Sequence, residues 1–250
     1  MSATELSLPA VAAAGPLPAL SQPFDFRLAL GIPLAAMAFL LLFDPSSLDF
    51  AISRWFYAPG EGFIGRHYGS FLENFLHDRA KQAVIVVGVL AIAGFLLSLL
   101  PTVFRRWRRV LGYVVLAMGL STSLVNPLKT LTGMHCPWSL KEFGGREVHT
   151  ALLEERAPPV VRAGRCWPGG HASAGFSLLA LFFALRDRRP RLARIALWTA
   201  LGLGAAFSVG RVMQGAHFLS HNLWTLLLDW TICTLGYRLI LYRPEASAPA

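Results

Sequence analysis

The stretch Ala83-Val-Ile-Val-Val-Gly-Val-Leu-Ala-Ile-Ala-Gly-Phe-Leu-Leu-Ser-Leu-Leu100 decides the fold class of this chain, because it contains no charged residue. Such a run is typical of a helix that crosses a bilayer. The whole chain agrees: 54% of its 250 residues are apolar, only 15% are charged, and the mean hydropathy is +0.50. A soluble domain carries about 25% charged residues. The composition therefore excludes a soluble or disordered protein and indicates an integral membrane protein.

Outward from this stretch, six apolar segments each predict a membrane-crossing helix. They lie near residues 28–43, 83–104, 110–128, 170–185, 195–213 and 218–240. The sequence thus predicts an all-α polytopic membrane protein, a six-transmembrane-helix bundle that occupies residues 26–241. Residues 1–25 are rich in Ala, Pro and Ser and are expected to form a flexible leader, and residues 242–250 a short cytoplasmic tail.

Arginine clusters predict the orientation of the bundle. They follow the second, fourth and sixth apolar segments: Arg105, Arg106, Arg108, Arg109, Arg186, Arg188, Arg189, Arg191, Arg194, Arg238 and Arg243. With six spans, all of these fall on one side, which the positive-inside rule makes cytoplasmic. Both termini are then cytoplasmic, and the other end of the bundle faces the periplasm or exterior of a bacterial inner membrane. The net charge of +9 does not indicate nucleic-acid binding, because the cations lie between apolar runs.

Two long segments remain on the outer side. In the first, residues 44–82, apolar positions 48, 52, 55 and 56 recur at helical spacing, which predicts an interfacial helix or, equally well, a solvent-covered loop helix. The second, residues 129–169, is a long polar outer loop that contains Cys136 and Cys166. An oxidising compartment would allow these two cysteines to form a disulfide, and two reduced, partly buried thiols are the alternative.

Three polar strings lie at the outer ends of the predicted spans. They are Lys129-Thr-Leu-Thr-Gly-Met-His-Cys-Pro-Trp138, Arg165-Cys-Trp-Pro-Gly-Gly-His-Ala-Ser173 and Gly210-Arg-Val-Met-Gln-Gly-Ala-His-Phe-Leu-Ser-His-Asn222. Ionisable groups at membrane depth are usually functional. The topology brings four of them to one membrane surface: Lys129, His171, Arg211 and His217. Two cations, two imidazoles and a Gly-Gly turn before a helix start predict a phosphate-binding site.

These strings resemble the signatures of the type 2 phosphatidic acid phosphatase superfamily, which are Lys-x6-Arg-Pro, Pro-Ser-Gly-His and Ser-Arg-x5-His-x3-Asp. The order and spacing match over roughly residues 28–240 of this chain. The resemblance implies that His217 is the nucleophile and forms a phosphohistidine. It also implies that His171 protonates the departing oxygen and then activates the water that hydrolyses the intermediate.

The same resemblance implies which groups hold the phosphate and that neither a metal nor an organic cofactor is needed. The phosphate-binding groups would be two side chains and two backbone amides: those of Lys129, Arg211, Gly169 and Gly170. Positioning and charge stabilisation are the main requirements of phosphoryl transfer. His135 flanks the first string and is a further candidate for the pocket, with a structural loop histidine as the alternative.

The chain departs from the signatures at three places. Cys136 replaces the arginine of the first signature. Arg165 either substitutes for that arginine or is a solvated loop residue. Gly169 replaces the serine of the second, which loses a hydroxyl but keeps an amide. His221 replaces the aspartate of the third, and the following Asn222 can accept a hydrogen bond but supplies no charge. An outer-loop acid is the remaining source of negative charge, among Glu142, Glu147, Glu154 and Glu155.

The leading functional prediction is a lipid-phosphate phosphatase at the outer face of the membrane, whose partners are the membrane and a lipid phosphomonoester or pyrophosphate. One alternative is a lipid phosphotransferase that uses the same site. Another is a non-catalytic lipid-phosphate binder or transporter, which the missing aspartate favours. A third is a metal site formed by His171, His217 and His221, because His-x3-His on one helix can chelate a metal. The sequence does not determine the oligomeric state.

Overall fold

The computed structural model describes residues 21–64, 80–154 and 163–244, and these residues are mostly helical. The α-helices are α1 (Phe26–Leu42), α2 (Ser46–Arg54), α5 (Ala80–Leu99), α6 (Arg108–Ser123), α7 (Val125–Thr132), α8 (Gly170–Phe176), α9 (Leu179–Leu185), α10 (Pro190–Met213) and α11 (Leu219–Gly236). Three short 3-10 helices are η2 (Val103–Trp107), η3 (Pro137–Ser139) and η4 (Lys141–Phe143), and η5 (Tyr237–Leu241) is a short π-helix. Strands β1 (Tyr57–Ala58) and β2 (Gly62–Phe63) form an antiparallel pair.

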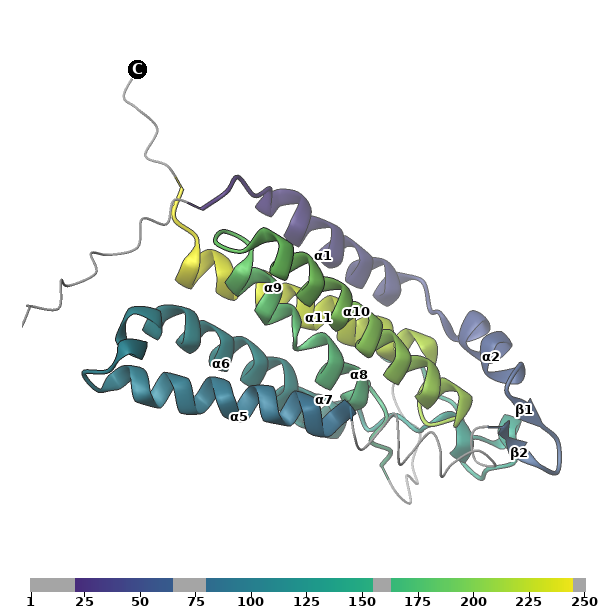
Figure 1. Ribbon diagram of the computed structural model, residues 1–250. Helices are drawn as coiled ribbons and strands as arrows, with labels where there is room; N and C mark the ends of the chain where they lie inside the picture. The colour runs from purple at the N-terminus through teal and green to yellow at the C-terminus, as the bar shows by residue number, and fades with distance from the viewer. Residues whose placement is uncertain (1–20, 65–79, 155–162, 245–250) are drawn as a thin grey trace, which may run out of the picture.

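The long helices lie side by side in an elongated bundle (Figure 1). Helix α11 is central, because it contacts α1, α6 and α8, while α10 packs on α8 and α9 and α5 packs on α6. The main core lies between these helices and includes the fully buried side chains of Tyr113, Leu179 and Tyr237. The Tyr113 hydroxyl donates a hydrogen bond to the carbonyl oxygen of Cys233 at 2.9 Å, which satisfies a polar group inside the bundle.

Local sequence explains where several helices begin and end. The Asp25 carboxylate accepts hydrogen bonds from the N–H groups of Arg27 and Leu28 and so caps α1. Helix α10 has Pro190 in its first turn, where proline is favoured. Helix α7 ends at Gly133, whose φ of +53° is a left-handed conformation that favours glycine.

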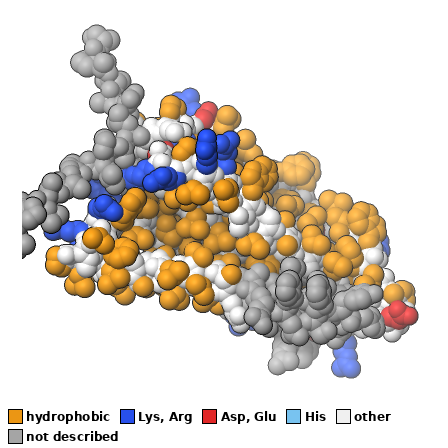
Figure 2. Space-filling model, viewed as in Figure 1, with side chains coloured by type: hydrophobic (Ala, Val, Ile, Leu, Met, Phe, Trp, Pro, Cys, Tyr) orange, Lys and Arg blue, Asp and Glu red, His pale blue; other side chains and the backbone are white. Residues whose placement is uncertain are grey.

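The flank of the bundle exposes apolar side chains, as expected for a surface that contacts lipid. Ile85 and Leu90 on α5 are 53% and 65% exposed, and Ile195 and Trp198 on α10 are 62% and 71% exposed. Hydrophobic side chains cover most of the described surface that Figure 2 shows, and most of the visible Lys and Arg lie at one end. An apolar surface of this extent is unusual for a soluble monomer.

Helices occupy all six segments that the sequence predicts to cross the membrane, but six spans are not shown. Among the described residues, three helical segments are long and apolar enough to span a bilayer: Lys81–Leu99, Val103–Ser139 and Pro190–Met213. Helices α1 and α2 qualify only as a pair, bent by 88°, which gives up to four spans. The segment Gly170–Leu185 is too short by this measure. The buried polar residues of α11, such as Asn222 and Asp229, lower the hydropathy of that helix.

The arginine clusters lie together at the end of the bundle away from the polar strings. The Arg188 guanidinium lies 5.5 Å from the Trp107 ring, which connects the α9–α10 turn to the α5–α6 turn. The last residues of the predicted leader are also held at this end: the Ser21 N–H donates to the Arg243 carbonyl at 2.9 Å. Of the predicted flexible leader, residues 21–25 are described and contact the bundle, and residues 1–20 lie outside the described part. Residues 245–250 of the predicted tail also lie outside it.

At the opposite end, an outer cluster of aromatic residues covers the bundle. It contains Phe63, Phe143 and Phe218, which come from the strand pair, the outer loop and the start of α11. Gly215 contacts this cluster with a φ of +67°, and a Cβ atom at this position would collide with the Phe63 ring. Glycine is therefore required in the turn that leads from α10 to α11. Helix α2 lies within the first outer segment, at the place where the sequence predicts a helix, and it contacts α11.

Candidate active site

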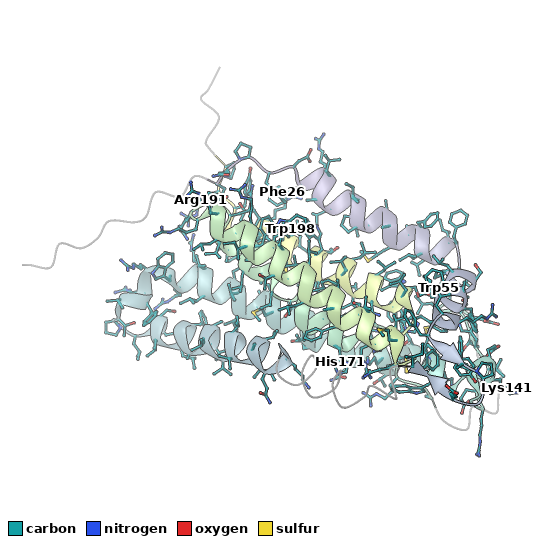
Figure 3. All side chains as sticks on the ribbon, turned by 45° about the vertical axis from the view of Figure 1, so that its right-hand side comes forward. Phe26, Trp55, Lys141, His171, Arg191 and Trp198 are labelled. Atoms are coloured by element: carbon teal, nitrogen blue, oxygen red, sulfur yellow. A yellow bond between two sulfur atoms is a disulfide. The ribbon has the colours of Figure 1, made fainter. Side chains whose placement is uncertain are left out.

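The three polar strings lie at one end of the bundle on separate elements. Helix α7 carries Lys129, α8 carries His171, and the last turn of α10 carries Arg211. His217 lies in the turn between α10 and α11. In Figure 3, His171 lies toward the end of the bundle that holds Lys141, away from Arg191. The site is therefore assembled from parts of the chain that are up to 88 residues apart, counted from Lys129 to His217 (217 − 129).

Backbone hydrogen bonds and a disulfide join the three strings. The Trp138 N–H donates to the Gly215 carbonyl at 2.9 Å, which ties the first string to the third. The Cys166 N–H donates to the Met134 carbonyl at 3.0 Å, which ties the first string to the second. Cys136 and Cys166 form a disulfide, which is the first of the two alternatives that the sequence left open. These links hold the strings as one unit.

The side chain of His217 is 3% exposed and lies against the disulfide. Its Nδ1 is 3.4 Å from Sγ of Cys166, an atom that has no proton to donate in a disulfide. Several cationic or titratable groups lie close enough for their charges to act on the ring: Lys129, His221, Arg211 and His171. Burial, followed by these charges, holds the pKa of His217 well below its usual value. The neutral imidazole that results is the form that can attack phosphorus.

The cations gather beside the Gly-Gly turn. Lys129 lies close enough to Arg211 and Arg165 for their charges to interact. A Cβ atom built on Gly170 would lie 3.6 Å from Nζ of Lys129, so the ammonium group lies against the start of α8. Nη1 of Arg211 donates to Oε1 of Gln214 at 2.8 Å, which fixes the guanidinium. Three like charges at such short range repel one another, and an anion bound among them would relieve that repulsion.

Gly169 faces α11. Its N–H donates to Oγ1 of Thr225 at 2.9 Å and lies 3.2 Å from the carbonyl oxygen of His221. This donor is therefore used within the fold, and phosphate binding by the Gly169 amide stays a prediction. Gly170 is the first residue of α8 and lies beside Lys129, and its predicted role in phosphate binding stays a prediction.

The two residues predicted to support the nucleophile lie in the first turn of α11. The His221 side chain is 1% exposed, and its ring centroid lies 6.0 Å from that of His217. Nδ2 of Asn222 donates to the Phe218 carbonyl at 3.2 Å, a bond within the same turn. Both side chains are buried against the site, and neither supplies the negative charge that the third signature normally provides.

The outer-loop residues considered at the sequence level have partners within the loop. Nε2 of His135 lies 3.6 Å from Oε2 of Glu147, an ion pair when the imidazole is protonated. Glu154 accepts a hydrogen bond from the Ala151 N–H at 2.9 Å. Glu155 lies outside the described residues. These contacts are all between residues of the outer loop, and none of them involves His217.

Sequence reasoning missed a buried acid, Asp49. This residue lies on α2, is 5% exposed, and accepts hydrogen bonds from both the N–H and the hydroxyl of Ser220, at 2.9 and 2.5 Å. The signal was present in the helical spacing, because Asp49 precedes the apolar positions Ile52 and Phe56 by three and seven residues. An acid on the apolar side of an amphipathic helix needs a buried partner.

A group of potential metal ligands lies beside the nucleophile. Among the described residues, Cys166, His217 and His221 each offer one ligand atom, and these atoms lie within 4.8 Å of one another. The alternative derived from the sequence used His171 in place of the cysteine, and the structure does not bring that set together. A sulfur atom in a disulfide is not the thiolate that binds metals, so this group lacks its third ligand.

Two adjoining cavities lead from the site toward the apolar flank. The smaller, about 90 Å³, is lined by Lys81, Gly170, His171, Ala174 and Phe207. The larger, about 370 Å³, lies between α5, α6 and α8 and is lined mainly by apolar residues. Both are bordered by Lys81, Gly170 and Ala174, so the small cavity that contains His171 and Lys81 adjoins the larger apolar one.

Comparison with known proteins agrees with this arrangement. Neither the curated proteins nor the solved structures searched contain a match to the chain. The model of one family, described as the PAP2 superfamily, matches residues 110–245, which is more than half of the chain and includes all three polar strings. The match begins on α6 and continues to the end of the described residues, so it covers every candidate catalytic and phosphate-binding residue. The chain therefore belongs to the PAP2 superfamily.

Proposed function

We propose that this protein is a membrane phosphatase that hydrolyses the phosphomonoester or pyrophosphate head group of a lipid through a phosphohistidine intermediate. Membership of the PAP2 superfamily supports phosphatase activity on phosphomonoesters. The observation that carries the proposal is the convergence of four groups on one site: Lys129, Arg211, His171 and His217. Three of these come from different helices, and no structural need of the fold explains why they meet.

The reaction would begin with attack by a ring nitrogen of His217 on phosphorus. The bond from phosphorus to the leaving oxygen breaks, and that oxygen takes its electron pair and a proton from His171. Lys129 and Arg211 would stabilise the charge on the phosphoryl oxygens, with Arg165 as a third cation. His171, now neutral, would then accept a proton from the water molecule that attacks the phosphohistidine.

The adjoining cavities support a lipid as the substrate. A phosphate head group bound among the cations would lie beside His171, in the compartment bordered by Lys81. The attached hydrocarbon chain would extend into the apolar cavity between α5 and α8. A substrate without such a chain would leave this apolar surface unfilled and lose the associated hydrophobic contribution.

The membrane arrangement that we propose is a multi-pass protein of six crossings in a bacterial inner membrane. The arginine-rich end would be cytoplasmic, together with both termini, and the active site would face the periplasm or exterior. The disulfide beside the site supports this orientation, because disulfides persist in oxidising compartments.

The direct test measures phosphate release from a panel of lipid phosphates in detergent, with a chelator present. We expect the wild type to release phosphate, and His217→Ala and His171→Ala each to lower turnover by at least ~100-fold. Helical circular dichroism and thermal unfolding of each variant would establish that it is folded. Wild-type turnover in His217→Ala would exclude the mechanism.

The same measurement separates the two alternative functions. A phosphotransferase would release little phosphate in water alone and would transfer the phosphoryl group when a second lipid alcohol is added. A non-catalytic binder would retain a phospholipid without releasing phosphate under any condition. The absence of the family aspartate at His221 and the replacement of the family arginine by Cys136 both favour the binder.

A further inference from the structure

Among the residues that the structure describes, no acid contacts His217 directly. When His217 forms a bond to phosphorus, its ring becomes positively charged and its second nitrogen carries a proton. An acid next to such a ring normally orients it and stabilises that charge. In this structure, Nδ1 of His217 faces the disulfide sulfur of Cys166, and the residue four positions later is another histidine, His221.

Asp49 reaches the same part of the fold from α2. Helix α11 begins after Phe218, which has no side chain able to cap the exposed N–H groups. The carboxylate of Asp49 takes this place, with Oδ1 accepting from the Ser220 N–H and Oδ2 from the Ser220 hydroxyl. Ser220 directly precedes His221 in sequence, so the acid lies at the turn that carries both imidazoles.

A cavity lies between this acid and His221. It has a volume of about 90 Å³ and is lined by Asp49, Ser220 and His221. The Asp49 carboxylate has lone pairs beyond the two that Ser220 uses. The acid and His221 therefore border the same cavity.

His221 in turn lies beside the nucleophile. A ring nitrogen of each of the two histidines lies within 4.8 Å of the other, and the ring planes are inclined by 67°. A small rotation closes such a gap, and hydrogen bonds of this kind commonly tighten when substrate binds.

We propose that Asp49 is the positioning acid of this enzyme and acts on the nucleophile His217 through His221. As His217 bonds to phosphorus, its second nitrogen shares its proton with His221, and the Asp49 carboxylate balances the positive charge across the cavity that Asp49 and His221 both line. When water hydrolyses the phosphohistidine, the proton returns to His217. His221 therefore takes the position of the family aspartate without its charge, and α2 supplies that charge.

This inference rests on the proposed phosphatase function, and its test separates the two. The rate of phosphoenzyme formation and the values of kcat and KM would be measured for Asp49→Asn, His221→Asp and the double variant. Asparagine keeps a hydrogen-bond acceptor for the Ser220 N–H, so the helix cap largely survives while the charge is lost. Glu61→Gln, which removes an exposed acid from the turn between β1 and β2, is the matched control.

We expect Asp49→Asn to lower kcat about 10- to 100-fold with little change in KM, in the range found for outer-shell partners of a catalytic group. His221→Asp places an acid next to His217, so activity should remain and should no longer depend on Asp49. In that background, Asp49→Asn should cost less than about threefold, a rescue that a purely structural cap would not give. Glu61→Gln should behave as the wild type.

Two outcomes would overturn the inference. One is an equal loss from Asp49→Asn in the wild-type and His221→Asp backgrounds, which would limit Asp49 to capping α11. The other is wild-type kcat in His221→Asn, a variant that interrupts the relay without altering the cap and so remains informative if Asp49→Asn fails to fold. A wild-type protein without phosphatase activity would instead reject the proposed function.

Discussion

Oδ1 of Asn222 occupies the space into which a Cβ atom at Gly169 would project. The glycine that replaces the serine of the second signature therefore fits against the asparagine that follows the third signature. The Gly169 N–H also bonds to Thr225, so the Gly-Gly turn is fastened to α11 through its backbone. This contact fixes where α8 begins, and with it the position of His171.

This contact predicts that restoring the family serine will damage the protein. In Gly169→Ser, the new Cβ atom would collide with Asn222 and displace the turn, so we expect a loss of activity of at least ~10-fold and a lower unfolding temperature. In Gly169→Ser combined with Asn222→Ala, the space is free and most of the activity should return. Equal activity of Gly169→Ser and the wild type would show that the close contact between Gly169 and Asn222 does not position the turn.

The buried position of His217 predicts the pH dependence of catalysis. Its pKa is lowered by burial and then by the Lys129 charge, so the ring remains neutral below its ordinary pKa of 6.5. The acidic limb of kcat/KM should therefore lie below pH 6.5. The same shift predicts that stability falls as the pH drops below 6.5, because the unfolded chain then binds a proton that the folded ring does not.

The measurement is kcat/KM between pH 4.5 and 8 with two substrates whose phosphate groups differ in pKa. A limb common to both substrates belongs to the free enzyme and not to the phosphate. An acidic limb at or above pH 6.5 for both would contradict the neutral, buried state of this histidine.

The Cys136–Cys166 disulfide should stabilise the outer loop and the nucleophile beside it. The bridged cysteines are 30 residues apart, for which loop-closure entropy predicts about 3–4 kcal/mol. We expect Cys136→Ser combined with Cys166→Ser to lower the unfolding temperature and to reduce kcat. Treatment of the wild type with a dithiol reductant should have the same effect and should leave the double variant unchanged. Identical unfolding of oxidised and reduced wild type would refute the prediction.

The apolar cavity predicts a variant that distinguishes lipid chains. Gly119 lines this cavity, and no atom lies within 4 Å of a Cβ atom built on it, so Gly119→Leu would fill the space without a backbone clash. We expect KM for a long-chain lipid phosphate to rise about 10-fold, while hydrolysis of a short, water-soluble phosphate ester stays constant. Gly31→Leu, at an equally open position on α1, is the matched control. Equal effects of both variants on the lipid substrate would exclude this cavity as the chain-binding site.

Helix positions and the convergence of the candidate site residues could be predicted from the sequence, because both depend on local patterns. Apolar runs placed helices over the six segments, and spacing within each string identified Lys129, His171, Arg211 and His217 as one set. The number of spans could not be predicted in the same way. The polar residues of α11 face the interior of the bundle, and hydropathy alone does not record that.

Only the tertiary structure decided how the site is completed. Asp49 and Ser220 are 171 residues apart, and the Gly169 amide is occupied by a hydroxyl from α11. The choice between a disulfide and two thiols likewise depended on the distance between residues 136 and 166 in the folded chain. Contacts of this kind have no periodicity in the sequence, because they arise when separate helices pack. The amino-acid sequence alone therefore determined which chemical groups this protein carries, and packing decided which of them act together.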